Sequence, residues 1–186
     1  MMRWTFHDLT GYVPDQTDER YSGLRYGCRP FSYNGCETIA CYHALLSLGV
    51  GGSSMSDAKK CTLWSVMAYL GRHGMWLWGL FGTYPHALFR FCRDYGLAWR
   101  KYAKKDYDSI TERVVLYCYW NPRFHGIHTV ELHQVKYRES RPCGKEYGYI
   151  ITNYRPQKNR VFPTMAAALR AIRTPMPILC LGVKTL

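Results

Sequence analysis

The spacing of apolar side chains changes about halfway along the chain, from a helical period to the alternation typical of strands. The first half predicts three helices, over residues 36–48, 56–70 and 85–96. The first has apolar residues on more than one face, so we expect a central helix that is buried on most sides. Ser56 and Asp57 offer caps for the second, which should stop at Gly71, and Pro85 suits the first turn of the third.

The second half of the chain is rich in aromatic and β-branched residues at alternating positions. This pattern predicts strands, with one late helix at 164–173 among them. The expected strands cover 97–102, 114–120, 128–137, 147–153 and 178–183. Helices followed by an antiparallel sheet define the α+β class, with a helical side facing a sheet side.

The chain length of 186 residues suits one domain. We divide it into an N-terminal arm or loop (1–35), which is polar and rich in Tyr, Gly and Pro, a mainly helical part (36–96) and a mainly β part (97–186). No apolar run approaches the roughly 20 residues of a membrane span, and no secretory signal opens the sequence. We therefore expect a cytoplasmic protein that binds no membrane.

Eight cysteines are spread over the chain without a Cys-x-x-Cys pair, which argues against a disulfide scaffold and against a structural zinc site. His128 and His133 are an odd number of residues apart on one predicted strand, so their side chains should point to opposite faces and not share a metal. The sequence therefore predicts reduced thiols and no metal site.

The formal net charge is +12, from 25 Lys and Arg against 13 Asp and Glu. The basic residues are scattered without a dense block, and no nucleic-acid-binding motif accompanies them. We expect a solvated basic surface that binds nucleic acid weakly and without sequence preference.

Candidate chemistry centres on Cys36, because a thiol that must ionise gains most from the first turn of a helix. A cysteine nucleophile needs an imidazole to take its proton and a third group to hold that imidazole. His128 opens one predicted strand and Asn153 ends its neighbour, so both can lie at one end of the sheet. This arrangement predicts a Cys36 pKa below the ~8.5 of a free thiol. Cys41, about 140° further around the helix, should face the core.

Four segments together, at residues 34–38 (NGCET), 82–88 (GTYPHAL), 126–130 (GIHTV) and 151–156 (ITNYRP), resemble the C39-like branch of bacterial papain-type cysteine peptidases. In that family a Gly-Cys pair opens the nucleophile helix, Gly-x-x-Pro precedes a later helix, Gly-x-His begins a strand, and a polar segment orients the histidine. The match covers most of residues 16–156, and the order and separation of the segments carry it.

The resemblance implies a papain-like fold, a peptide or protein substrate, no cofactor, and catalysis through an acyl-enzyme on Cys36. It implies His128 as general base and Asn153 as the orienting residue, although many relatives have Asp at this position. No Gln stands within a few residues before Cys36, so Gln16 is the candidate oxyanion donor beside the Cys36 N–H.

Two other functions stay open at this stage. A relative without catalysis would keep the cleft to hold a peptide or a protein partner, consistent with the missing nearby Gln. A basic nucleic-acid-binding domain is the third alternative.

Overall fold

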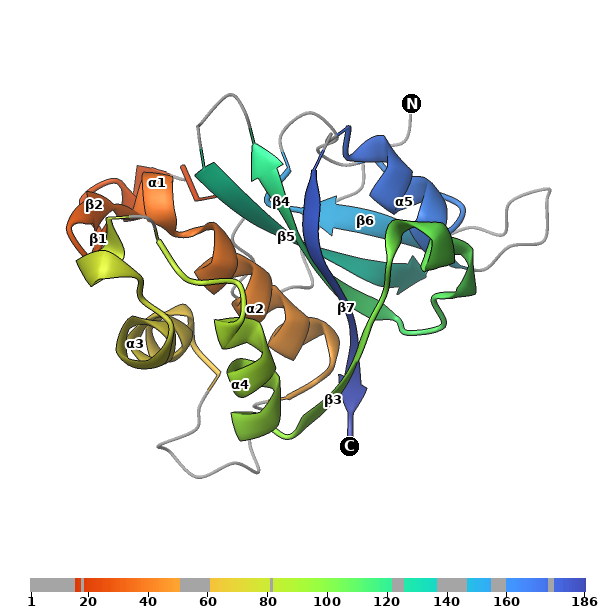
Figure 1. The fold of residues 1–186 in the computed structure, drawn as a ribbon, viewed down its shortest axis with the longest axis horizontal. Coiled ribbons are helices and arrows are strands. Elements are labelled where there is room, and N and C mark those ends of the chain that lie inside the picture. Colours follow the sequence, from red (N-terminus) through yellow and green to blue (C-terminus); the bar gives the residue numbers. More distant parts are fainter. Residues whose placement is uncertain are drawn as a thin grey trace.

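An antiparallel sheet with helices on both faces forms the centre of the computed structural model (Figure 1). The structure describes residues 16–17, 19–50, 61–80, 82–121, 126–136, 147–154, 160–173 and 176–186. The helices are α1 (Phe31–Asn34), α2 (Cys36–Ser47), α3 (Leu63–His73), α4 (Ala87–Asp94) and α5 (Met165–Ala171), and 3₁₀ turns cover Glu19–Tyr21, Leu77–Gly79 and Lys104–Ser109.

Five strands form the sheet, in the order β3-β7-β4-β5-β6, and all neighbours are antiparallel. They are β3 (Leu97–Lys101), β4 (Val114–Asn121), β5 (Gly126–Lys136), β6 (Tyr147–Thr152) and β7 (Pro177–Thr185). A separate short pair joins β1 (Arg25–Tyr26) to β2 (Arg29–Pro30). The predicted α+β class with an antiparallel sheet is confirmed.

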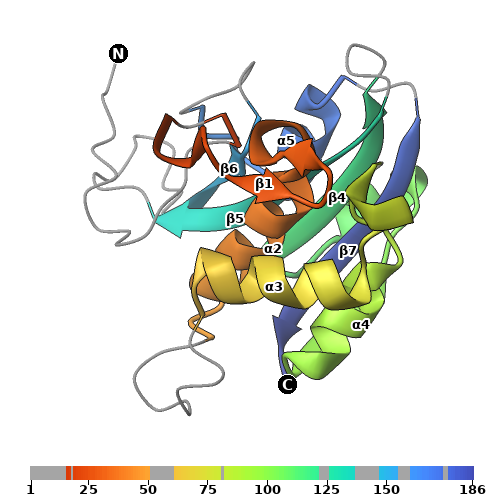
Figure 2. The ribbon, with the colours of Figure 1, turned by 90° about the vertical axis from the view of Figure 1, so that its left-hand side faces the viewer.

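Side chains alternate between two hydrophobic clusters across the sheet. On β4, Val114, Leu116 and Cys118 face α2, α3 and α4, whereas Val115, Tyr117 and Tyr119 face α5 and the turn Lys104–Ser109. Figures 1 and 2 show the helices of the first half on one side of the sheet and α5 on the other. The expectation of one helical side was therefore incomplete, because the face left open by α2, α3 and α4 is covered by α5.

The first predicted helix is the central one. Its residues from Cys36 to Leu45 are all buried, and it packs against α3 and against β4 and β5. Cys41 is completely buried, as its position around the helix predicts. Apolar residues on several faces of the helix favour this burial, which also encloses the polar side chains of Glu37, Thr38 and His43.

Three boundaries differ from the prediction. Helix α3 begins after Thr62, whose hydroxyl accepts from the Ser65 N–H in a capping box, and the predicted caps at 56–57 lie outside the described residues. The helix continues through Gly71 to His73, because one internal glycine costs only about 1 kcal/mol. Gly74 is its C-cap. A side chain at this position would clash, because a Cβ atom would lie 2.6 Å from the Ala87 Cβ. Helix α4 begins at Ala87, two residues after Pro85.

The segment predicted as an N-terminal arm is partly ordered structure. Within its described residues it contains the strand pair β1–β2 and α1, and Phe31 and Tyr26 are buried in the core. Two core aromatic residues among polar neighbours have no periodicity, so the pattern did not reveal them. Residues 1–15 lie outside the described part.

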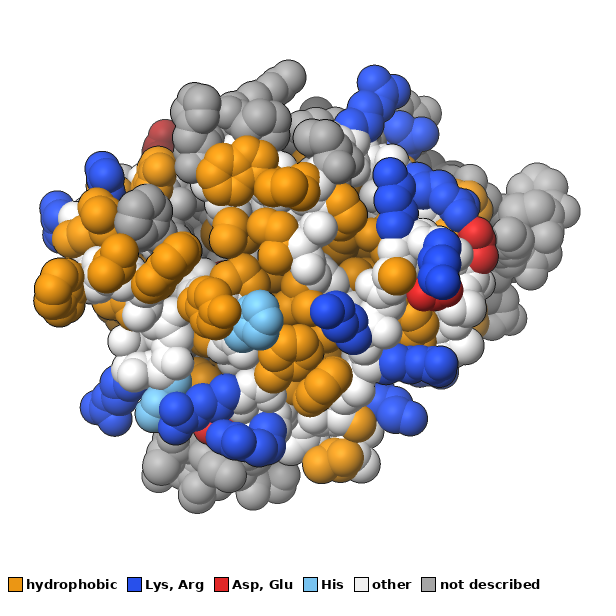
Figure 3. Space-filling view, viewed as in Figure 1, with side chains coloured by type: hydrophobic (Ala, Val, Ile, Leu, Met, Phe, Trp, Pro, Cys, Tyr) orange, Lys and Arg blue, Asp and Glu red, His pale blue; other side chains and the backbone are white. Residues whose placement is uncertain are grey.

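The face of the molecule seen in Figure 3 carries hydrophobic side chains with lysine and arginine distributed around them. Among the described residues, no helix is both long enough and apolar enough to cross a membrane.

Candidate active site

Cys36 is the first residue of α2, and its side chain reaches the start of β5. The thiol Sγ lies 3.9 Å from the Ile127 carbonyl oxygen, at the peptide bond that precedes His128. The side chain is 7% exposed. Packing of α2 on β5 therefore brings the candidate nucleophile next to the backbone of the candidate base.

The His128 imidazole is held by the residue that follows β6. Its Nε2 lies 2.9 Å from the Asn153 backbone oxygen, and the ring packs edge-on against Tyr119, with centroids 5.6 Å apart. A carbonyl oxygen only accepts hydrogen bonds, so Nε2 carries the proton and Nδ1 keeps its lone pair in the neutral ring. This is the tautomer in which Nδ1 can accept a proton.

The alternation of β5 separates the side chains around the site. Ile127 and Thr129 point toward α2, where the Thr129 hydroxyl contacts the Cys118 sulfur at 3.2 Å, while His128 points to the face that carries Tyr119. The thiol and the imidazole thus approach one short backbone segment from different sides. In this conformation each makes its hydrogen bond to a backbone carbonyl and not to the other.

The Asn153 side chain contacts Gln16 instead of the imidazole. Its Oδ1 accepts from the Gln16 N–H at 3.1 Å, and its Nδ2 lies 3.4 Å from both Gln16 Oε1 and the Thr129 oxygen. Asn153 has a φ of +57°, in the left-handed region that Asn tolerates. The residue expected to orient His128 does so through its carbonyl.

Gln16 contacts both Asn153, which follows β6, and α1, which precedes Cys36. Its Nε2 donates to the Ser32 carbonyl at 2.7 Å and lies 3.4 Å from the Tyr33 carbonyl, both in α1. The amide hydrogens of the predicted oxyanion donor are therefore directed at α1 in this conformation.

The protonation states of Cys36 and His128 differ from the expectation of a readily ionised thiol. Burial raises the pKa of the Cys36 thiol, and the nearby Thr129 and Glu37 N–H groups offset this only in part. Burial also lowers the pKa of His128, against the opposing hydrogen bond to Asn153. The predicted lowering of the Cys36 pKa is therefore wrong, because loss of water outweighs the helix terminus. At neutral pH the resting groups are a thiol and a neutral imidazole.

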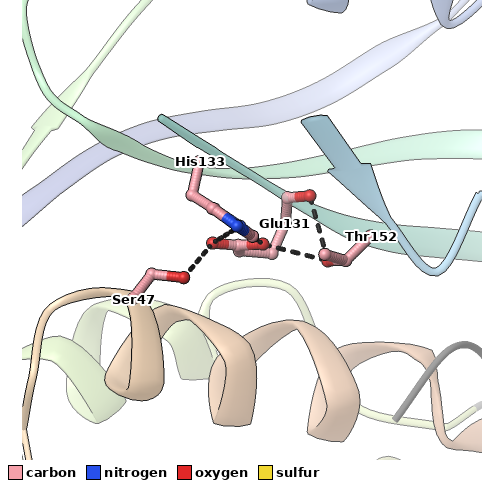
Figure 4. A network of polar contacts seen from close by, with 4 residues as sticks. All are labelled: Ser47, Glu131, His133 and Thr152. Carbon is pink, nitrogen blue, oxygen red and sulfur yellow. Dashed lines mark hydrogen bonds and ion pairs between the residues drawn. The ribbon is translucent and has the colours of Figure 1, made fainter. Parts of the chain in front are cut away.

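A second polar cluster lies at the other end of the α2–β5 interface, and sequence reasoning missed it (Figure 4). The fully buried Glu131 accepts from Ser47 Oγ at 3.1 Å, from His133 Nδ1 at 2.9 Å and from Thr152 Oγ1 at 3.0 Å. The signal in the sequence was a Glu and a His two residues apart on one strand, and hence on the same face of the sheet. His133 faces α2 and His128 faces Tyr119, as strand alternation predicts.

The described residues contain no group of three or more His, Cys, Asp or Glu side chains arranged to hold a metal ion. Seven cysteines are described, all as free thiols, while Cys143 lies outside the described part.

No family model matches the chain, and neither the curated proteins nor the solved structures contain a match to it. The case for a function therefore depends on the geometry of the residues themselves.

Proposed function

We propose that the protein is a papain-like thiol hydrolase that cleaves amide bonds of a peptide or protein through an acyl-enzyme on Cys36. The observation that carries the proposal is the hydrogen bond from His128 Nε2 to the Asn153 oxygen. It fixes the tautomer with a free Nδ1 lone pair, at the strand end where the Cys36 sulfur lies 3.9 Å from the Ile127 oxygen.

The reaction begins from neutral groups. As Cys36 Sγ attacks the substrate carbonyl carbon, its proton passes to His128 Nδ1, and a tetrahedral oxyanion forms. The C–N bond then breaks as the imidazolium gives that proton to the leaving amine. Water, deprotonated by the same nitrogen, releases the acyl group and restores the thiol. Proton transfer requires Sγ and Nδ1, which approach β5 from different sides in this conformation, to meet when substrate binds.

The oxyanion donors follow from the first turn of α2. Its N–H groups and the helix dipole favour negative charge beside Cys36. Gln16 joins them only after its amide leaves the Ser32 carbonyl, so substrate must displace this hydrogen bond.

Two specific observations favour the alternative of a catalytically inactive relative that binds a peptide or protein in the same place. The Cys36 thiol is 7% exposed, and burial raises its pKa. A thiol of this kind reacts slowly unless substrate changes its surroundings.

Proteome-derived peptides, with new termini identified by mass spectrometry, test the proposal. We expect the wild type to cleave peptides, Cys36→Ala to lose cleavage, and Cys41→Ala, a buried thiol on the same helix, to keep it. Peptides that bind to the wild type without being cut would favour the inactive relative.

Asn153→Gly separates the two ways in which this residue can orient His128. Glycine adopts the +57° φ and keeps the carbonyl, but it removes the side chain that contacts Gln16. If the carbonyl orients His128, Asn153→Gly retains cleavage within about threefold, while Asn153→Ala loses more because alanine is strained in this region. Equal loss in both variants would assign the role to the side-chain amide.

A further inference from the structure

A loop after α3 presents four large apolar side chains to water. We call it the tryptophan loop and define it as Trp76, Leu77, Trp78 and Leu80. Leu77 is 50% exposed and Trp78 is 85% exposed. The loop lies beside β1 and β2, at the left in Figure 1, and the same end of the molecule shows clustered hydrophobic side chains in Figure 3.

The backbone of this loop is strained in a way that keeps its side chains outside. Leu77 and Trp78 have φ values of +44° and +53°, in the left-handed region that residues with a side chain rarely adopt. Strain that exposes hydrophobic groups lowers stability, and it is typical of sites selected for binding.

The strained turn is held in place from the neighbouring elements. The Cys28 N–H donates to the Trp78 oxygen at 3.0 Å, and the buried Asn34 amide donates to the Gly79 oxygen. Gly27, at a φ of +65°, lets the loop approach, since a Cβ there would lie 2.5 Å from the Trp78 oxygen. The apolar side chains are therefore presented on a preformed support.

The charged side chains nearest to the tryptophan loop in the sequence are basic. Residues 21–35 and 70–86 contain three arginines and no acidic residue, whereas Glu19 and Asp94 lie just outside these segments. Arg25 and Arg29 on the strand pair and Arg72 at the end of α3 are exposed. A ligand must therefore accept apolar side chains at its centre and positive charge at its margin.

We propose that the tryptophan loop is a docking site for the surface of an anionic phospholipid bilayer, with Trp78 and Leu77 entering the interface and the arginines contacting the headgroups. Tryptophan and leucine on a basic surface are the composition of interfacial anchors. Each arginine near an anionic leaflet tightens binding by roughly fivefold. The site is separate from Cys36 chemistry and stands without it.

The side chains of the tryptophan loop favour a lipid bilayer over single-stranded nucleic acid, the other common anionic ligand. Single-stranded nucleic acid binds to aromatic platforms by base stacking, to which the aliphatic Leu77 and Leu80 contribute nothing. A bilayer takes up aliphatic and aromatic side chains alike, and it accommodates a projecting loop without a matching cavity.

Sedimentation of the full chain with extruded vesicles tests the proposal. Vesicles of phosphatidylcholine with about 30% phosphatidylserine should bind it at least about tenfold more tightly than phosphatidylcholine alone. Trp78→Ala should weaken binding about tenfold or more, whereas Trp64→Ala, at a 59% exposed tryptophan of α3, should leave it within about twofold. Arg72→Gln should reduce the preference for phosphatidylserine. Trp78→Gly, which fits the +53° φ, should reproduce the loss seen in Trp78→Ala without strain.

Several results would overturn the proposal. Failure to bind either vesicle would do so, as would equal losses in Trp64→Ala and Trp78→Ala. A lipid-free dimer that Trp78→Ala dissociates would assign the loop to a second copy of the chain. Binding of an oligouridylate that depends on Trp78, with no vesicle binding, would assign it to nucleic acid.

Discussion

Glu131→Gln tests whether the polar cluster in the α2–β5 interface holds a buried ion pair. The carboxylate is fully buried and accepts hydrogen bonds from Ser47, His133 and Thr152. Burial alone would raise the Glu131 pKa, but His133 and the Thr152 hydroxyl lower it below its usual value. Burial opposes protonation of His133, and Glu131 nevertheless raises the His133 pKa. Between about pH 4.3 and pH 6.5 both groups are therefore charged, whereas burial without Glu131 would favour a neutral His133.

The size of the effect follows from the burial. Removing one partner of a buried, hydrogen-bonded pair costs about 3–5 kcal/mol. For a chain of this length, each kcal/mol moves the melting temperature by about 2–4 °C, so we expect Glu131→Gln to lower it by roughly 6–20 °C. Asp108→Asn is the surface control. Asp108 pairs with Arg170, and both side chains are more than half exposed, so its loss should lower the melting temperature far less than Glu131→Gln does.

The pH dependence gives the variant a second signature. A raised His133 pKa contributes stability that is complete below about pH 6.5 and is lost as pH rises through the folded pKa. A lowered Glu131 pKa contributes stability above about pH 4.3 that is lost on acidification. Urea unfolding of wild type and variant should therefore differ most near pH 5–6, and less at alkaline pH. Burial lowers the His43 pKa to about 4, against the opposing effect of Glu131. Near pH 5–6 His43 therefore destabilises both proteins similarly, whereas below about pH 4 it destabilises Glu131→Gln more, because the variant lacks the Glu131 charge.

Glu37→Gln is the buried control for the same experiment. Burial raises the Glu37 pKa well above its ordinary value, which favours the neutral carboxyl, and its Oε1 has no hydrogen-bond partner within the described residues. Exchanging one neutral group for another should cost less than about 1.5 kcal/mol. If Glu131→Gln costs no more than Glu37→Gln, or if its cost does not change with pH, the assignment of a charged pair is refuted.

Three further predictions concern the thiols and the surface charge. Alkylation of Cys36 by iodoacetamide should rise with pH through a midpoint above the ~8.5 of a free thiol, and a midpoint below pH 7 would contradict the burial argument. Cys41→Ala should lower the melting temperature by a few degrees, because it leaves a small cavity at a completely buried site; an unchanged melting temperature would refute this packing role. The +12 charge should give weak nucleic-acid binding that falls steeply with salt in a filter assay, and sequence-specific binding at physiological salt would refute this.

The order and type of the main elements could be predicted from the sequence, because they follow from periodicity. The five predicted strands lie within one or two residues of β3, β4, β5, β6 and β7, and the late helix contains α5. The start of α3 and the ordered segment before α2 could not be predicted in this way. Thr62 caps its helix through one hydroxyl, and Phe31 is buried by tertiary contact alone.

The candidate site was predictable in location but not in its detailed contacts. Strand-end positions put His128 and Asn153 at neighbouring ends of β5 and β6, as expected. The acceptor for His128 is a backbone oxygen, which every residue carries, so the identity of residue 153 could not reveal it. The sequence likewise gave a helix start for Cys36 but not its burial, which determines the direction of its pKa. The expectation that the protein binds no membrane considered only segments that could span a bilayer. The docking proposed for the tryptophan loop is contact with the bilayer surface, which that expectation did not consider.

Asn34 links the two proposed sites, because it fixes the tryptophan loop and stands two residues before Cys36. Its buried amide donates to the Gly79 oxygen and, at 3.1 Å, to the Tyr26 oxygen. Asn34→Ala leaves two buried carbonyls without this donor, each at a cost of about 1–3 kcal/mol.

We expect the Asn34→Ala variant to loosen both the tryptophan loop and the first turn of α2. Under conditions where it remains folded, it should therefore bind anionic vesicles more weakly and alkylate faster at Cys36. Trp78→Ala should change only vesicle binding, since it leaves the Asn34 contacts intact. Unchanged Cys36 alkylation in Asn34→Ala would show that the helix start is held by its packing on β5 alone.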